Sequence, residues 1–112
     1  MTPFNILQMR NPSSGGGGIT WGDIVRTSNP PVVGANADQT MTGTGMLNLS
    51  YSGSASWSVF KNGISQGQVG SISVAPGHTV HFQFSSSVND SGVMSITGLV
   101  TDSFNVSLNT LS

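Results

Sequence analysis

The 112-residue sequence contains no cysteine, which excludes disulfide bonds, thiolate catalysis and cysteine-ligated zinc. Charged residues are scarce as well: they make up 6% of the chain, against about 25% in a typical soluble protein. With only 3 Lys+Arg and a net charge of −1, the chain lacks the basic patch that nucleic acid or an anionic membrane surface requires. We therefore expect neither a nucleic-acid partner nor a membrane partner.

Long apolar runs are also missing. No run approaches the ~20 residues that span a bilayer, and the opening stretch MTPFNILQMRNPSS has no basic region followed by a continuous apolar one, as a signal peptide would. An apparently extracellular composition without a signal suggests release by lysis or by assembly. Virion proteins leave cells in this way.

The residues that are present are typical of β-structure. From about residue 36, apolar and polar side chains alternate, and Gly, Pro and Asn recur at short intervals; this period of two predicts strands joined by tight turns. No segment shows a helical period, so we expect an all-β, small antiparallel β-sandwich, with the sets at 80–84 and 47–51 on opposed inner faces. The expected inward-facing sets are Leu47/Leu49/Tyr51, Ala55/Trp57/Val59, Ile72/Val74, Val80/Phe82/Phe84, Met94/Ile96 and Phe104/Val106/Leu108.

The composition divides the chain into three segments. Residues 1–12 form an expected docking arm, residues 13–18 (SSGGGG) a Gly/Ser tether, and residues 19–112 the sandwich domain, with a core module at 36–112. Residues 19–25 could add a short strand, or a neighbouring chain could complete the sheet. We interpret the arm as a partner-binding segment rather than a frayed end because it carries four apolar side chains: Phe4, Ile6, Leu7 and Met9.

Residues able to carry chemistry are few and widely spaced. There is no glutamate, and the four aspartates fall beside the first strand or in expected loops. His78 and His81, three positions apart around a strand start, point to opposite faces and cannot chelate one metal together. The Gly-Ile-Ser-Gln-Gly spelling at 63–67 follows a hairpin turn rather than opening a helix, which argues against a nucleophile elbow. We expect no enzyme activity, no cofactor and no metal.

The stretch WSVFKNGISQG at 57–67 could form either a ligand-reading loop or a hairpin. Alternation assigns Trp57 to the core with Val59, and Asn62-Gly63 tolerates the positive φ of a tight turn. Lys61 is then expected at an exposed tip. The hairpin interpretation is favoured.

Three stretches carry a family resemblance: WSVFKNG at 57–63, VAPGHTV at 74–80 and SFNVS at 103–107. Over roughly residues 45–110 they resemble immunoglobulin-like or fibronectin-like β-sandwich modules of bacteriophage virion proteins and some bacterial surface proteins. His78 stands where that pattern usually has aspartate. The stretch ITWGDI at 19–24 is similar to a segment of phage tail-fibre chains. The resemblance implies a non-enzymatic virion component, either tail-associated or a capsid decoration.

Two functions follow as hypotheses. In the first, the chain is a virion structural protein, assembled in the host cytoplasm and then carried outside on the particle. Its arm and Trp21 contact major capsid or tail subunits, and a closed homo-oligomer, such as a trimer, is expected. In the second, the chain is a carbohydrate- or host-receptor-binding module that stacks sugars on exposed aromatic rings, for which Trp21, Trp57 and Tyr51 are the candidates. The two overlap, since a decoration protein could also bind glycans weakly.

Overall fold

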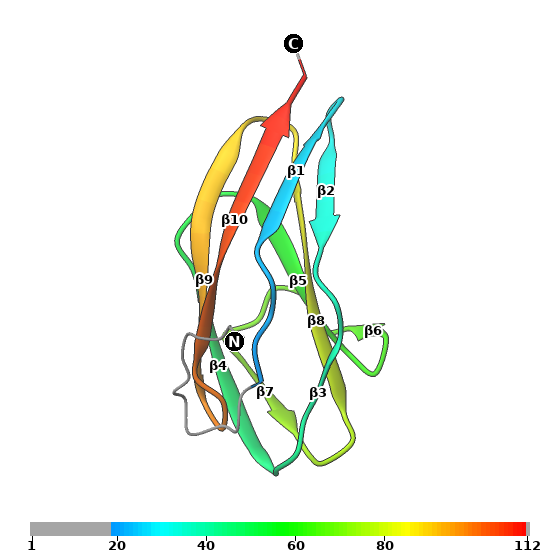
Figure 1. The fold of residues 1–112 in the computed structure, drawn as a ribbon, viewed down its shortest axis with the longest axis vertical. Coiled ribbons are helices and arrows are strands. Elements are labelled where there is room, and N and C mark those ends of the chain that lie inside the picture. The colour runs from blue at the N-terminus through cyan, green and yellow to red at the C-terminus, as the bar shows by residue number, and fades with distance from the viewer. Residues whose placement is uncertain (1–18, 112) are drawn as a thin grey trace, which may run out of the picture.

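A computed structural model describes residues 19–111, and these residues form strands and loops without a helix. The strands pack in two layers, which Figure 1 shows with β1 and β10 side by side in one of them. The elements are β1 Ile24–Ser28, β2 Val32–Ala35, β3 Gln39–Thr40, β4 Gly45–Tyr51, β5 Ser56–Lys61, β6 Ile64–Ser65, β7 Ser71–Val74, β8 Thr79–Ser86, β9 Asp90–Gly98 and β10 Asp102–Thr110.

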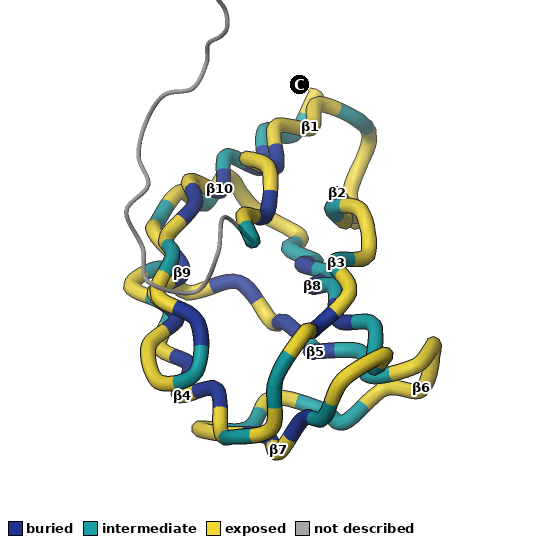
Figure 2. The backbone as a smooth tube through the Cα atoms, turned by 60° about the horizontal axis from the view of Figure 1, so that its bottom comes forward, coloured by how far each residue is buried: buried dark blue, intermediate teal, exposed yellow. Residues whose placement is uncertain are grey.

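The two layers are separate sheets. Sheet A has the order β1-β10-β9-β4-β7, and sheet B has the order β2-β8-β5-β6, with the short β3 also paired to β8. Figure 2 shows buried and exposed residues alternating along the strands. Phe82 and Phe84 of β8 face Phe104 of β10 across the interior, with ring centroids 5.4 and 6.1 Å apart. The all-β sandwich prediction is therefore confirmed.

The alternation pattern located the central strands correctly. Each expected inward-facing set falls in or directly beside one of β4, β5, β7, β8, β9 and β10. All but one of the expected inward-facing side chains are buried; the exception is Tyr51, which is half-buried at the end of β4. The Trp57 side chain is only 8% exposed to solvent and lies in the core, as predicted. Period-two burial is a local property of a strand, so the sequence alone can reveal it.

The first strand differs from its prediction in position and direction. It was expected over residues 19–25, but β1 begins at Ile24. It pairs in parallel with β10, with Ile24 opposite Val106 and Ser28 opposite Thr110. The sandwich is thus antiparallel except for this pair, and the chain supplies its own first strand. Directly before β1, the Asn105 N–H of β10 donates to the Asp23 carboxylate at 2.8 Å, so a side chain makes this contact with β10.

Two short strands were not expected. Residues Asn29-Pro30-Pro31 separate β1 from β2, and the Pro30–Pro31 peptide is cis. Both β2 and the later β3 pair with β8. Asn36 bridges the gap between them: its N–H donates to the Phe82 carbonyl at 3.2 Å, and its Oδ1 accepts the Phe82 N–H at 3.0 Å. Strands β1 and β2 therefore lie before residue 36, within the sandwich domain expected over residues 19–112.

The hairpin at Asn62-Gly63 is confirmed. Asn62 and Gly63 have φ values of 55° and 80°, as a type I′ turn requires at both central positions, and Lys61 pairs with Ile64. Lys61 itself is half-buried rather than extended from an exposed tip. Its Nζ donates to the Ser73 carbonyl of β7 at 3.0 Å, so the side chain crosses from sheet B to the edge of sheet A.

Candidate binding surface

The proposed arm lies outside the described residues. The structure therefore gives no position for its four apolar side chains, Phe4, Ile6, Leu7 and Met9. Trp21 is the one partner-binding candidate that the structure places.

Trp21 is part of the core and not of a surface. Its side chain is 3% exposed, and its ring lies edge-on to Phe82 at 5.4 Å. The backbone N–H donates to Asp102 Oδ2 at 2.9 Å, and Nε1–H donates to the Val80 carbonyl at 2.8 Å. The prediction that Trp21 is exposed for a partner is wrong, because the segment before β1 is bonded to both sheets and carries the indole into the interior.

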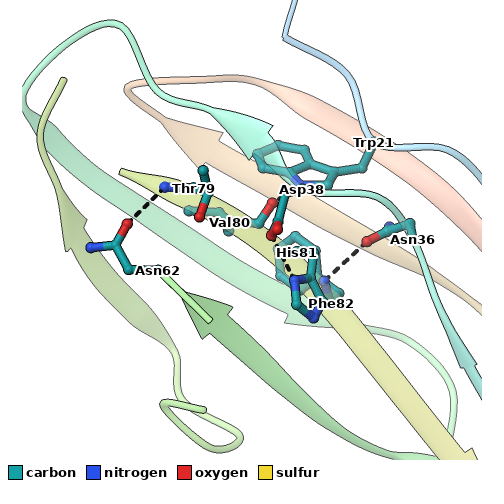
Figure 3. A network of polar contacts seen from close by, with 8 residues as sticks. All are labelled: Trp21, Asn36, Asp38, Asn62, Thr79, Val80, His81 and Phe82. Atoms are coloured by element: carbon teal, nitrogen blue, oxygen red, sulfur yellow. Dashed lines mark hydrogen bonds and ion pairs between the residues drawn. The ribbon is translucent and has the colours of Figure 1, made fainter. Parts of the chain in front are cut away.

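Trp21 belongs to a set of contacts that we call the N-terminal clamp, made of Trp21, Asn36, Val80 and Asp102. Figure 3 shows Trp21 and Asn36 converging on β8, where they meet Val80 and Phe82. The Asn36 amide also donates to the Gly22 carbonyl at 3.3 Å. The clamp joins the chain just after the tether to β8 of sheet B and to the first residue of β10 in sheet A.

The other two candidates for sugar stacking are also occupied within the fold. Trp57 lies beside Phe84, with ring centroids 6.4 Å apart. Tyr51 is half-buried against Phe84 at 4.8 Å, and its hydroxyl donates to Asp90 Oδ2 at 2.7 Å. Neither ring is available as a stacking platform, so the structure does not support these residues as a glycan site.

The Asp90 carboxylate accepts several hydrogen bonds from the β4–β5 loop and its flanks. Besides Tyr51, the Ser54 and Ala55 N–H groups donate to its carboxylate, each at 2.9 Å. Burial opposes ionisation of Asp90, but the hydrogen bonds from Ser54, Tyr51, Ala55 and Ser91 outweigh it and lower the pKa of the carboxyl. Burial, reinforced by the Asp90 contact, raises the pKa of the Tyr51 phenol well above its usual range. The cluster fixes the β4–β5 loop. It also favours an ionised Asp90 carboxylate beside a protonated Tyr51 phenol.

We expect the Asp90 cluster to make stability depend on acidic pH. Because the folded pKa is depressed, Asp90 stabilises the fold above the unfolded carboxyl pKa of about 3.9, and this contribution is lost as pH falls through the folded value. Asp90→Asn should cost about 1 kcal/mol at pH 7 after solvent screening, and less at pH 3. Urea unfolding at the two pH values measures the difference.

The control for this experiment is Asp23→Asn, whose carboxylate accepts a backbone hydrogen bond from Asn105. It should change the pH dependence less than Asp90→Asn does. Equal pH dependence in wild type and Asp90→Asn would contradict the role assigned to Asp90.

The histidines occupy a turn and a surface, as expected. His78 precedes β8, and its Nδ1 accepts the Ala75 N–H at 3.1 Å; it closes the turn where the resembling modules have aspartate. His81 lies on β8 beside Asp38, with Nδ1 and Oδ1 2.7 Å apart. Within residues 19–111, no group of three or more His, Asp or Glu side chains could hold a metal ion. Ser65, the serine of the Gly-x-Ser-x-Gly spelling, lies on β6, and its hydroxyl accepts the Gly67 N–H at 3.2 Å.

The outer face of sheet B carries a feature that sequence reasoning missed. Phe60 and His81 are cross-strand neighbours there, and their rings stack with centroids 4.6 Å apart and planes 8° from parallel. Both side chains are half-buried. The sequence does contain a signal for this feature. Phe60 follows the buried Val59, so it is an aromatic residue on the strand face that otherwise carries Ser56 and Ser58.

These features define an immunoglobulin-like β-sandwich. Several of its ionisable side chains hold loops or turns in place by hydrogen bonds to the backbone. A search of known folds finds similarity to the ASH/PapD-like domain of human CEP192 (PapD-like domain 7), at 13% identity and a TM-score of 0.44, covering 100% of this chain and 97% of that one. No protein-family model matches the chain. No curated protein sequence matches it either.

Residues 19–111 contain no helix that is long and apolar enough to cross a membrane.

Proposed function

We propose that this chain is a non-enzymatic structural protein of a bacteriophage virion. Its arm, residues 1–12, attaches it to capsid or tail subunits, and the immunoglobulin-like sandwich is displayed outward as a capsid decoration or tail-associated domain. The family resemblance of the strand and turn motifs supports this role, as does the division of the sequence into arm, tether and sandwich.

The observation that carries the proposal is the N-terminal clamp. Trp21 lies three residues after the Gly/Ser tether and is hydrogen-bonded to both sheets, through Asp102 and Val80. A domain displayed on a tether needs a firmly held attachment point. Without one, force on the tether would separate the first strand from its sheet. The buried indole provides that point.

The chemistry of the aspartates agrees with a structural role. Asp23, Asp90 and Asp102 each accept backbone N–H groups, and Asp38 pairs with His81. Three of the four carboxylates thus hold a segment of backbone in place. The arm contributes four apolar side chains, and in a homo-oligomer several arms act together, which raises the avidity of weak individual contacts.

The arm is tested in the full-length protein by replacing its apolar side chains. We expect Phe4→Ser/Ile6→Ser/Leu7→Ser/Met9→Ser to leave a folded, soluble protein whose copy number on phage particles falls at least tenfold. The physical reason is the loss of the apolar surface that docks. Particles purified from cells producing the variant, analysed by quantitative mass spectrometry, give the copy number.

A matched control changes polar positions of the same arm. Asn5→Ser/Gln8→Ser keeps the apolar set, so incorporation should stay within twofold of wild type. Normal incorporation of the apolar variant would refute arm docking. Electron microscopy of the labelled particle then distinguishes a capsid site from a tail site.

A further inference from the structure

A shallow hollow of about 120 Å³ lies on the outer face of sheet B. It is formed by β5 and β8, next to the stacked rings of Phe60 and His81. Four of its lining residues carry hydroxyl or amide side chains and two are aromatic: Ser56, Ser58, Gln83, Ser85, Trp57 and Phe60.

The polar side chains of this hollow have no hydrogen-bond partner among residues 19–111. Ser58, Gln83 and Ser85 are half-buried, yet neither they nor Ser56 make a side-chain hydrogen bond to any described residue. Elsewhere comparable groups secure loops, as the Asn36 and Asn89 amides do. Polar groups that are partly withdrawn from water and left unpaired are what a polar ligand can satisfy.

The strand register holds these groups in fixed positions. Ser56 pairs with Ser85, Ser58 with Gln83 and Phe60 with His81, so three successive cross-strand pairs build the surface. The Phe60 ring is held on one side by the His81 imidazole, which is itself held by Asp38. The hollow therefore combines unpaired polar groups with a positioned apolar wall, on a sheet rather than on a loop.

The hollow also carries no net charge. None of its lining residues is ionisable. His81, the cross-strand neighbour of Phe60, faces Asp38 at 2.7 Å, and the Lys61 ammonium bonds to Ser73 on sheet A. A charged ligand would meet no opposite charge here. A neutral sugar ring matches the lining, because its hydroxyls can exchange hydrogen bonds with serine and amide groups while its C–H surface contacts an aromatic ring.

We propose that this hollow on β5 and β8 binds one neutral hexopyranose unit of a glycan, with Gln83 and the serines bonding its hydroxyls and Phe60 contacting its C–H surface. The site is smaller than the ~300–1,000 Å³ pockets that enclose drug-sized ligands, so a single copy binds weakly, with a Kd in the millimolar range. Several copies on one particle or oligomer would convert this weak binding into firm adhesion. The inference does not depend on where the chain is located.

The test is a titration of the full-length, isotope-labelled protein with defined sugars, followed by amide NMR. The probes are maltohexaose, cellohexaose and mannohexaose, with trigalacturonate as an anionic comparison. We expect saturable shifts with at least one neutral oligomer, confined to amides near 56–60 and 81–85. Gln83→Glu should weaken that binding about tenfold, equivalent to ~1.4 kcal/mol, because a carboxylate loses the amide donors.

The matched control is Asn48→Asp, the same amide-to-acid change on an exposed position of β4, in the outer face of sheet A. It should leave binding within twofold of wild type. Three results would overturn the proposal: no shift with any neutral oligomer, shifts with trigalacturonate only, or shifts at these amides that depend on protein concentration without sugar. The last would identify the face as a contact between copies of the chain. Because no particle is used, failure here is independent of the arm-docking test.

Discussion

Replacing Trp21 by alanine is expected to lower the free energy of unfolding by at least about 4 kcal/mol. Removing a buried tryptophan costs about 3–5 kcal/mol through lost contacts and the cavity that remains. The Val80 carbonyl also loses the indole donor, which adds about 1 kcal/mol or more. Small domains have only about 5–15 kcal/mol of stability in total, so this variant should be close to unfolding at room temperature.

The control is Trp21→Phe, which keeps an aromatic ring against Phe82 but cannot donate to Val80. We expect it to cost less than half as much as the alanine variant. The chain contains two tryptophans, so the fluorescence of Trp57 reports unfolding in guanidinium chloride for both variants. An alanine variant within about 1 kcal/mol of wild type would contradict the central position assigned to Trp21.

Gly98→Ala is expected to cost about 3–5 kcal/mol, for two separate reasons. Gly98 closes β9 with φ at 110°, a conformation that side chains with a Cβ disfavour. A Cβ at this position would also overlap the Met46 carbonyl oxygen of β4, a backbone atom that cannot turn aside. Equilibrium unfolding followed by circular dichroism measures the loss.

Two further glycines separate these causes. Gly63 has φ at 80° but open space around it, so Gly63→Ala should show the conformational cost alone, about 1–2 kcal/mol. Gly22 has neither a positive φ nor a neighbour within 4 Å, and Gly22→Ala should change stability by less than about 1 kcal/mol. If the three variants were equally stable, the close approach of Gly98 to β4 would be disproved.

The sequence predicted what is local in this fold. The alternation at Val80, Phe82 and Phe84 identified β8 and its buried face, and Asn62-Gly63 identified the hairpin. Trp21 could not be placed in the same way, because the residues that bury it are distant in sequence: its two partners are 81 and 59 positions away. Its glycine neighbour, Gly22, and a short flanking segment gave it the local signature of an exposed residue.

The outer face of sheet B shows the same difference between what is local in sequence and what depends on distant residues. The inward set Ala55, Trp57 and Val59 leaves Phe60 on the outer face of the same strand. That His81 would stand opposite Phe60 depends on the register between β5 and β8, which alternation alone does not specify. The parallel pairing of β1 with β10 likewise joins the two ends of the described chain and has no local signal.

That parallel pairing has a mechanical consequence. The chain enters β1 at Ile24, opposite Val106, and β10 ends at Thr110, opposite Ser28, so entry and exit lie at opposite ends of the ladder. Figure 1 shows β10 ending near the top of the sandwich, while the segment that precedes β1 lies in its lower half. A pull between the tether and the end of β10 would therefore load the hydrogen bonds of all five residue pairs in shear, all at once, rather than unzip them in turn. Trp21, which precedes β1 and is hydrogen-bonded to both sheets, would bear the load first and pass it to both of them.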